Sequence, residues 1–381
     1  MTNDYSTGLY NEGVNDIYHS AFGALTEAYE KFINPLNIKT YMKDKMRLNV
    51  LDICYGIGYN TKALLNEILT LDISGKEISI DCVDNDKILI ELSPFISSRI
   101  NLLKRIKAKK YLRKNVESYD EAKKIINLKT GINKTYKIHD LVNQILIKNL
   151  INEYGHDFLS EESKKIMAKN ENHAFFDLST LKFYKFLLNF EVILHLKQNK
   201  SAFVHNIYYK NISKRIIDVF KKKHLDNISI NFCPKDIREH LKETDKEYDI
   251  VFLDGFTPSK CPCIWTEEFF SKLYTLMSTD SILVTYNSSA PVRNAMQKAG
   301  FYIGNTLNNK NDIIGTVAAK IETYIKHELT EKQIGLLNTK SGIPYRDENL
   351  LLDNDTILLN RKNEFDSSDL ISASQYLKKN K

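Results

Sequence analysis

The sequence contains no apolar run near the roughly 18 residues that a membrane-spanning helix requires. Its polar N-terminus also lacks the short apolar core of a secretory signal peptide. The five cysteines, at positions 54, 82, 233, 261 and 263, show neither disulfide nor zinc spacing, and this usage is typical of a reducing cytoplasm. Cys261 and Cys263 flank a single proline without other ligands nearby, which favours local structure over half of a metal site. We therefore expect a cytoplasmic protein without membrane or metal partners.

The composition is that of a folded protein. With 381 residues, of which 43% are hydrophobic, the chain can build a sizeable core, and global disorder is excluded. Its length allows one large domain with insertions or two domains. The net charge of +6 is modest, so the distribution of the charges is more informative than their sum.

Residues 50–61 form the stretch around which the chain is organised. A short apolar strand that includes Asp52 is followed by a glycine turn and then by helical spacing of apolar residues. Gly56 and Gly58 allow the backbone to approach a ligand at the start of the helix. A dinucleotide fingerprint needs a third glycine, but position 61 is threonine, so S-adenosylmethionine (SAM) fits better than NAD. An ordinary turn between strand and helix remains the alternative.

The N-terminal segment predicts a small hairpin and a helix over about 23–33 that ends before Pro35. His19, Ser20 and Glu27 lie close to the start of this helix. They indicate either a capping arrangement or a lid over the ligand, and the spacing favours capping.

Residues 78–84 read as the second strand. A carboxylate at the end of this strand can accept hydrogen bonds from both ribose hydroxyls of an adenosyl group. Asp84 is the first choice for this role and Asp81 the second, while a carboxylate in a strand-end turn is the structural alternative.

Residues 96–200 interrupt the alternation of strands and helices, and we interpret them as a helical insertion. Helical spacing occurs over 98–113, 118–127, 138–153 and 179–197. The insertion carries a basic run that suits either a solvated helix face or contact with nucleic-acid phosphates. The run consists of Lys104, Arg105, Lys107, Lys109, Lys110, Arg113 and Lys114, with Tyr111 among them.

Regular alternation returns after the insertion. The pattern predicts a strand over 202–210, a helix over 213–223, a strand over 228–232 and a helix over 236–243. Asp236 follows the second of these strands, where a carboxylate can accept from the adenine amino group and also cap the next helix.

Residues 248–266 carry the most chemistry. An apolar strand over 250–253 ends at Asp254, where open α/β sheets place their ligands. This carboxylate can hold an amine, while Phe256 and Trp265, the only tryptophan, can stack on a base. The structural alternative is a buried Asp254 that caps its own turn, with Trp265 in the core.

The C-terminal part predicts a strand over 281–286, a helix over 292–299 and a hairpin of 300–304 with 315–320. An antiparallel end to the sheet is typical of class I SAM-dependent methyltransferases. The predicted units are 1–48 (hairpin, helix and lid), 49–95 with 201–322 (SAM-binding core), 96–200 (basic helical insertion) and 323–381 (tail on the core or partly flexible).

Four stretches carry a resemblance to a known family: YHSAFGALTEA (18–28), LDICYGIGYNT (51–61), DIVFLDGFTPSKCPCIWTEEFF (249–270) and ILVTYNSSAPVRNAMQKAGF (282–301). The chain resembles the methyltransferase half of the bifunctional enzyme that completes 5-methylaminomethyl-2-thiouridine at the tRNA wobble position. IPYRD (343–347) looks like a tail motif of the stand-alone relatives. A second glycine fingerprint for the flavin oxidoreductase half is not found, so we expect the stand-alone form.

The resemblance implies a class I α/β fold and methyl transfer from SAM to the amine of 5-aminomethyluridine in tRNA. Asp254 would hold the acceptor amine, with Phe256 and Trp265 beside it. Lys260 and the basic run (Lys104, Arg105, Lys107, Lys109, Lys110, Arg113) would contact the tRNA anticodon stem-loop. The implied cofactor contacts are Glu27 at the methionine end, Asp52, Tyr55, Gly56, Gly58, Asn60, Thr61, Asp84 at the ribose, Asp236 at the adenine, and Asp254.

Two other functions remain open. A spermidine-synthase-like aminopropyl transferase shares the fold and also places an Asp at a strand end, but it uses decarboxylated SAM and needs no tRNA. An RNA-binding protein with a degenerate SAM site would bind tRNA in a salt-sensitive way without binding SAM.

Overall fold

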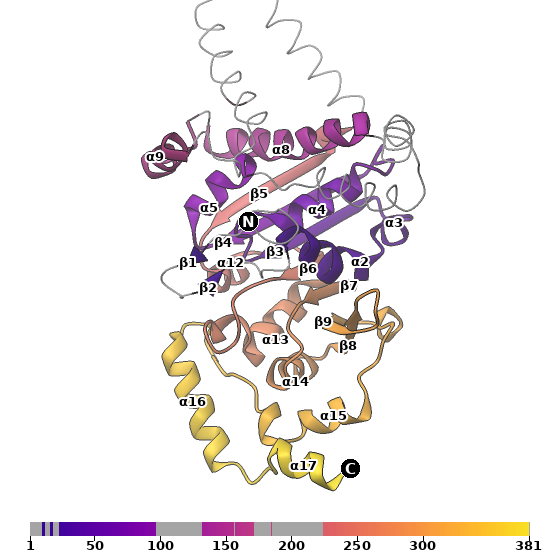
Figure 1. Cartoon of the computed structure of the whole chain (residues 1–381), viewed down its shortest axis with the longest axis vertical. Coiled ribbons are helices and arrows are strands. Elements are labelled where there is room, and N and C mark those ends of the chain that lie inside the picture. Colours follow the sequence, from indigo (N-terminus) through magenta and orange to yellow (C-terminus); the bar gives the residue numbers. More distant parts are fainter. Residues whose placement is uncertain are drawn as a thin grey trace, which may run out of the picture.

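The computed structural model describes residues 10–11, 16–17, 23–96, 132–155, 157–170, 184 and 224–380. Within these residues, seven strands form one sheet in the order β5-β4-β3-β6-β7-β9-β8 (Figure 1). Their bounds in that order are Ile228–Pro234, Glu77–Asp84, Arg47–Ile53, Tyr248–Leu253, Met277–Thr285, Ile313–Ala319 and Tyr302–Leu307. β5, β4, β3, β6 and β7 are parallel, whereas β9 is antiparallel to both β7 and β8. The predicted class I SAM-methyltransferase fold is confirmed.

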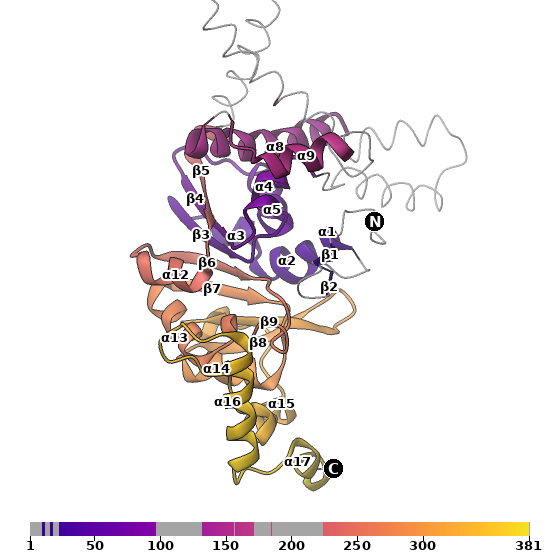
Figure 2. The same ribbon diagram turned by 90° about the vertical axis from the view of Figure 1, so that its left-hand side faces the viewer.

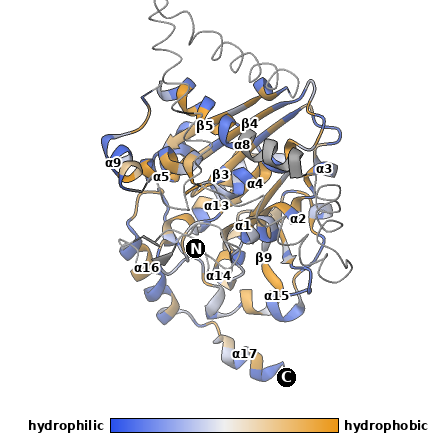
Figure 3. Ribbon diagram, turned by 45° about the horizontal axis from the view of Figure 1, so that its top comes forward, coloured by the Kyte–Doolittle hydropathy of each residue, from blue (hydrophilic) through white to orange (hydrophobic). Residues whose placement is uncertain are grey.

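The central strands are apolar on both faces because helices cover both. In β3, Val50 packs into one core cluster, while Leu51 and Ile53 pack into the other. Side chains along a strand point alternately to the two faces, so a near-continuous apolar run is what a doubly covered parallel strand requires. Figure 3 shows this as hydrophobic colour along the strands, whereas the outer helix α16 (Asn354–Ser367) is mostly hydrophilic.

The two helical layers are seen on either side of the sheet in Figure 2. One core cluster contains residues of α1 (Ala24–Glu27), η1 (Ala28–Ile33), α2 (Asn34–Leu36), α3 (Ile38–Tyr41), α4 (Tyr59–Ile68), α5 (Lys87–Leu92), η2 (Ser93–Phe95) and α8 (Ile132–Tyr154). The other contains residues of α12 (Ile237–Glu243), η4 (Pro262–Ile264), α13 (Glu267–Leu276) and α14 (Ala290–Lys298). The remaining elements are β1 (Tyr10–Asn11), β2 (Asp16–Ile17), α9 (Glu161–Asn170), η3 (Leu225–Asn227), η5 (Glu322–Tyr324), α15 (Glu331–Leu337), η6 (Lys340–Gly342) and α17 (Ala373–Lys379).

The N-terminal segment differs from the sequence prediction in one respect. The hairpin is present, because β1 and β2 pair antiparallel. The predicted helix over about 23–33 is present as α1 and the π-helix η1, which ends at Ile33, but a second short helix, α2, follows directly and includes Pro35. Pro35 lies in the first turn of α2, where a proline costs no intrahelical hydrogen bond. His19 and Ser20 lie outside the described residues.

Part of the predicted insertion packs against the edge strand β5. Helix α8 confirms helical structure over 138–153 and lies along β5, the edge strand (Figure 1). Its Asn149 and Glu153 side chains accept hydrogen bonds from the backbone N–H groups of Ile230 and Phe232. Edge strands expose unpaired backbone groups that favour aggregation, and these contacts satisfy two of them.

Several sequence predictions fall on residues outside the description: the remaining helices of the insertion, the basic run, the strand over 202–210 and the helix over 213–223. The boundaries of the four predicted units stay predictions. Among the described residues, no helix is both long and apolar enough to cross a membrane.

Candidate active site

Four adjacent parallel strands end at one edge of the sheet, and each is followed by a predicted site residue. In the order of the strands, these are Asp236 after β5, Asp84 at the end of β4, the glycine turn after β3 and Asp254 after β6. The carboxyl edge of an open α/β sheet is where such folds bind their ligands. The fold therefore collects at one edge residues that lie far apart in the sequence.

The turn after β3 is built from left-handed backbone. Cys54, Gly56 and Gly58 all have positive φ, at 62°, 54° and 77°. A Cβ on Gly58 would lie 2.4 Å from the Tyr55 ring, so this position has room only for glycine. The buried Tyr55 side chain packs inward, where its hydroxyl hydrogen-bonds Ser93 at 2.6 Å. Tyr55 thus shapes the turn through its ring and does not face a ligand with it.

Asp84 and the glycine turn are joined directly. The Gly56 N–H donates to Asp84 Oδ2 at 2.7 Å, and the Asp86 N–H donates to Oδ1 at 2.8 Å. Burial raises the pKa of Asp84 to about 6, while these two backbone donors oppose the shift. Each carboxylate oxygen keeps a second acceptor position, so both can still accept a hydroxyl.

Asp81, the second choice for the ribose role, belongs to a structural network instead. Its carboxylate accepts hydrogen bonds from Asn231, Lys246 and Tyr248, the last at 2.6 Å. This residue is only 4% exposed. With its acceptor positions occupied by protein donors, Asp81 ties β4 to β5 and β6.

Asp52 lies beneath the turn with one oxygen unsatisfied. Thr61 Oγ1 donates to Asp52 Oδ2 at 2.6 Å, whereas Asp52 Oδ1 is buried and has no hydrogen-bond partner among the described residues. Burial raises the pKa of Asp52 to about 8. An orphaned buried oxygen below a glycine cradle fits a ligand that forms a hydrogen bond with Asp52 at this turn.

Asp254 is a half-buried carboxylate held from the glycine-turn helix. Asn60 Nδ2 donates to Asp254 Oδ2 at 2.9 Å, and Oδ1 accepts no hydrogen bond from the described residues. Desolvation raises the pKa of Asp254 to about 6, against the lowering effect of Asn60. The negative charge of Glu27 contributes to the increase, and Lys31 opposes it. This carboxylate is therefore mostly ionised at neutral pH, with one oxygen directed away from its protein partner.

Glu27 reaches this region from the N-terminal segment. Its carboxylate accepts a hydrogen bond from Lys31 at 2.7 Å, across the junction between α1 and the π-helix η1. The Lys31 ammonium also lies 5.6 Å from the centre of the Tyr286 ring. π-helical segments occur frequently at functional sites, and here one brings a charged pair near Asp254.

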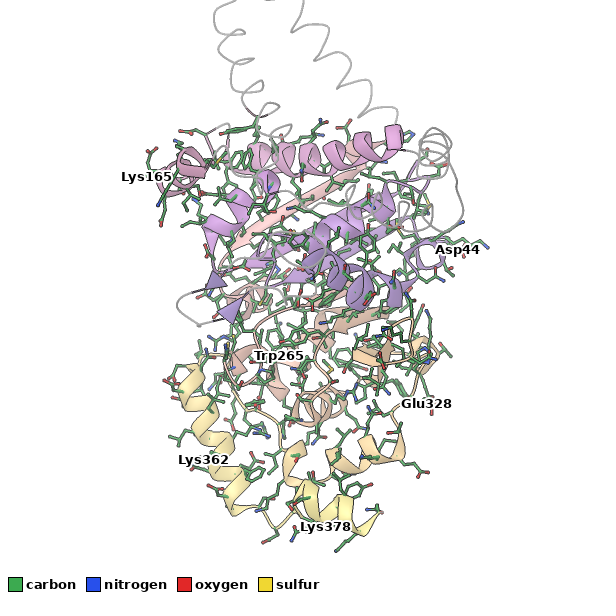
Figure 4. The ribbon with its side chains drawn as sticks, viewed as in Figure 1. Asp44, Lys165, Trp265, Glu328, Lys362 and Lys378 are labelled. Atoms are coloured by element: carbon green, nitrogen blue, oxygen red, sulfur yellow. The ribbon has the colours of Figure 1, made fainter. Side chains whose placement is uncertain are left out.

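The β6–α13 loop (residues 254–266) folds back on itself through its tryptophan. The Trp265 indole N–H donates to the Phe256 carbonyl at 2.8 Å, and the Trp265 ring packs edge-on against Tyr286. Trp265 is fully buried and lies in the interior, unlike the other residues labelled in Figure 4. A base could stack on Trp265 only after the loop had moved, whereas Phe256 is partly exposed. The Lys260 side chain is exposed on the same loop.

Asp236 has the capping role that the sequence suggested. Its carboxylate accepts from the backbone N–H of Arg238 at 2.8 Å and pairs with the Arg238 guanidinium. These bonds lower the pKa of Asp236 against the effect of burial. Arg238 donates to both carboxylate oxygens of Asp236, so an adenine amino group could bind Asp236 only alongside the guanidinium.

Sequence reasoning missed Lys31 and Tyr286. The Tyr286 hydroxyl donates to the Gly255 carbonyl at 2.9 Å and so supports the loop beside Asp254. Tyr286 directly follows β7, and the strand-end rule that selects Asp84 and Asp254 applies to it as well. Lys31 could have been found from its position four residues after Glu27.

Comparisons with known proteins agree with this fold. Residues 199–318 match a family model described as S-adenosyl-L-methionine-dependent methyltransferase. The crystal structure of MNMC2 from Aquifex aeolicus superposes with a TM-score of 0.58 at 18% identity, covering 96% of this chain and 84% of that one. An uncharacterized protein of Methanocaldococcus jannaschii is 24% identical over 383 residues, covering 99% of this chain and 75% of that protein.

Shorter matches are to the tRNA 5-methylaminomethyl-2-thiouridine biosynthesis bifunctional protein MnmC. The Campylobacter hominis protein is 26% identical over 182 residues, covering 45% of this chain and 25% of that protein. The Pseudomonas putida F1 protein is 39% identical over 74 residues, covering 19% of this chain and 11% of that protein. The matched segments thus span a quarter or less of these bifunctional relatives.

The sheet order, the glycine turn and the family match define the chain as a class I SAM-dependent methyltransferase. Within that class, its matched segments are similar to the methyltransferase region of MnmC proteins, and its fold is similar to that of MNMC2. SAM is the cofactor of this family, and the glycine cradle, the unsatisfied oxygen of Asp52 and the acceptor positions of Asp84 fit it.

Proposed function

We propose that the chain methylates the primary amine of 5-aminomethyl-(2-thio)uridine at the tRNA wobble position to give the 5-methylaminomethyl nucleoside. The names of the MnmC relatives support a tRNA substrate. The observation that carries the proposal is the Asp254 carboxylate, which ends β6 beside the glycine turn with one oxygen available to an amine. We propose a cytoplasmic location because the substrate is tRNA.

In this proposal the chain binds SAM along the sheet edge. The backbone of Gly56 and Gly58 lines it, Asp84 accepts the ribose hydroxyls and Asp236 contacts the adenine. Asp52, with Asn60 and Thr61 around it, and Glu27 lie toward the methionine end. SAM supplies an activated methyl group, so the protein's main task is to align the amine nitrogen with it.

The amine must lose its charge before it can react. An alkyl ammonium is mostly protonated at neutral pH, as the lysine side chain is. Asp254, with its pKa near 6, is ionised under these conditions, holds the ammonium and accepts its proton directly or through a water molecule. Its partly desolvated position strengthens the interaction with the cationic amine.

A wobble base must leave its stack to reach Asp254. Phe256 is the stacking partner in this proposal, because its ring is partly exposed, and Trp265 positions Phe256 through its indole N–H. Lys260, on the same loop, contacts the RNA backbone, as does the basic run 104–113.

The proposal is tested by offering the full chain three acceptors. These are tRNA that carries 5-aminomethyluridine with SAM, the same tRNA without that modification with SAM, and putrescine with decarboxylated SAM. Nucleoside mass spectrometry is expected to show gain of one methyl group on the aminomethyl nucleoside alone. Product from putrescine would instead establish an aminopropyl transferase, and binding of tRNA by a chain that does not bind SAM would establish an RNA-binding protein.

A further inference from the structure

The β6–α13 loop contains two thiols that face each other. Cys261 Sγ and Cys263 Sγ are 3.5 Å apart, within hydrogen-bonding distance for sulfur, and neither is in a disulfide. Pro262 lies between them at the start of η4. A disulfide bond is about 2.05 Å long, so the two sulfurs need to approach by only about 1.5 Å to be joined.

The two thiols differ in their ionisation. The pKa of Cys263 is lowered, chiefly because the Cys261 thiol hydrogen-bonds to it, with a further contribution from the Arg238 guanidinium. The pKa of Cys261 is raised by the same hydrogen bond and by burial. Of the two, Cys263 is therefore the more readily ionised thiol, which suits it as the attacking cysteine, while the partly exposed Cys261 suits the resolving role.

We propose that Cys261 and Cys263 form a modification site, a dithiol that a hydroperoxide converts reversibly into an intramolecular disulfide. The Cys263 thiolate attacks one peroxide oxygen, the O–O bond breaks, and the hydroxide that leaves takes up a proton. The Cys261 sulfur then attacks the resulting sulfenic acid, and the S–O bond breaks as water leaves with the Cys261 proton. Overall, two thiols and hydrogen peroxide give one disulfide and two waters.

The third cysteine of this region, Cys54, is the natural competitor. A Cβ on Gly255 would lie 3.0 Å from Cys54 Sγ and 2.1 Å from Ile264 Cδ1, so Cys54 and Ile264 both pack against Gly255. Desolvation, with the negative charge of Asp84, raises the pKa of the Cys54 thiol well above its usual value, whereas the pKa of Cys263 is lowered, so Cys54 has the smaller thiolate fraction even though Cys263 is the more buried residue. Ile264 follows Cys263 and packs on Gly255, so the pair is joined through one residue to the segment next to Asp254.

Trypsin provides a direct readout. Cleavage after Lys260 and Lys272 releases residues 261–272, which contain this pair and no other cysteine. The full chain is treated with hydrogen peroxide, blocked with iodoacetamide in denaturant, digested and measured by mass spectrometry. We expect the peptide to be unalkylated and two hydrogens lighter, and to carry two alkyl groups when dithiothreitol precedes the iodoacetamide.

The remaining cysteines serve as internal controls. Peptides with Cys54, Cys82 and Cys233 should stay alkylated, and the pair should react about ten-fold faster than they do. In the Cys261→Ser variant, Cys263 should stop at the sulfenic acid, which dimedone traps. A pair that is still doubly alkylated once the other cysteines are oxidised, or a crosslink to Cys54, would overturn the proposal.

Discussion

Replacing Asp254 with asparagine tests the chemistry assigned to the carboxyl edge of the sheet. Asparagine has nearly the same shape as aspartate, and its side-chain oxygen can still accept the hydrogen bond that Asn60 donates at 2.9 Å. The variant should therefore fold and keep the glycine turn. It loses the negative charge that holds an ammonium and takes up its proton.

The size of the effect follows from that loss. A positioned general base contributes about a hundred- to ten-thousand-fold to a rate, and half-burial at this site weakens rescue by bulk water. We expect Asp254→Asn to lower kcat/KM for tRNA about a hundred-fold or more, while the Kd for SAM changes less than about three-fold. Single-turnover methylation and calorimetric SAM binding measure the two quantities separately.

The pH profile gives a second readout. With its pKa near 6, Asp254 is active when ionised, so wild-type activity should fall as the pH decreases through about 6. Asn60→Ala removes a hydrogen bond that favours the ionised form, and this should shift the acid limb to higher pH. Turnover of Asp254→Asn within a few-fold of the wild type, or an acid limb that Asn60→Ala leaves in place, would refute the role of Asp254.

Three further predictions concern the frame of the site. Gly58→Ala should weaken SAM binding and lower the free energy of unfolding by about 1 to 3 kcal/mol, because the φ of Gly58 is 77° and the added methyl group meets the Tyr55 ring. Gly155→Ala is the control, since Gly155 has a similar φ of 84° but open space around it; this variant should lower the free energy of unfolding by only about 1 kcal/mol and leave SAM binding unchanged. Because the pKa of Asp52 is raised to about 8 in the folded state, the folded chain binds this proton more tightly than the unfolded chain does, and Tm should fall as the pH increases from about 4 to 8. Asp52→Asn should flatten this dependence of Tm on pH. Asp347→Asn should lower the free energy of unfolding by about 2 to 4 kcal/mol in urea titrations, because Asp347 is fully buried against Arg238; a change below about 0.5 kcal/mol would contradict that account.

The sequence was sufficient to predict the strands at the carboxyl edge and most of the carboxylates there. Short runs such as 250–253 are apolar at every position because both faces of the strand are buried, so they can be recognised as strands from hydrophobicity alone. Because parallel strands end at the same edge, Asp84, Asp236 and Asp254 could be assigned to one site from their positions after these runs. In the structure all three lie at this edge, while their membership of one binding site and their individual roles stay predictions.

The sequence could not predict features that depend on packing between distant segments. Asp81 and Asp84 lie on the same strand, and only the approach of Lys246 and Tyr248 shows that Asp81 is used within the protein. The short helix that includes Pro35 follows directly on a π-helical segment that local propensity does not encode. The burial of Trp265, whose indole N–H finds its partner in the Phe256 carbonyl, is likewise visible only in the folded loop.

The C-terminal tail was predicted least well, because its motif has meaning only through contacts far away in the chain. The Tyr345 carbonyl accepts the Glu267 N–H, and Arg346 pairs with Glu268 at 2.6 Å, so IPYRD fastens the tail beside the β6–α13 loop. Asn354, at the start of α16, contacts the same loop through the Cys263 N–H. None of these contacts leaves a periodic signal in the sequence.

Transfer of a labelled methyl group from SAM to the aminomethyl nucleoside is the decisive measurement for the proposed reaction. The full chain is incubated with methyl-deuterated SAM and tRNA that carries 5-aminomethyluridine, and the nucleosides are separated and weighed. We expect one deuterated methyl group on the aminomethyl nucleoside of the wild-type reaction and almost none with Asp254→Asn. A chain that binds SAM but leaves the nucleoside unlabelled, or labels it equally well without Asp254, would contradict the account.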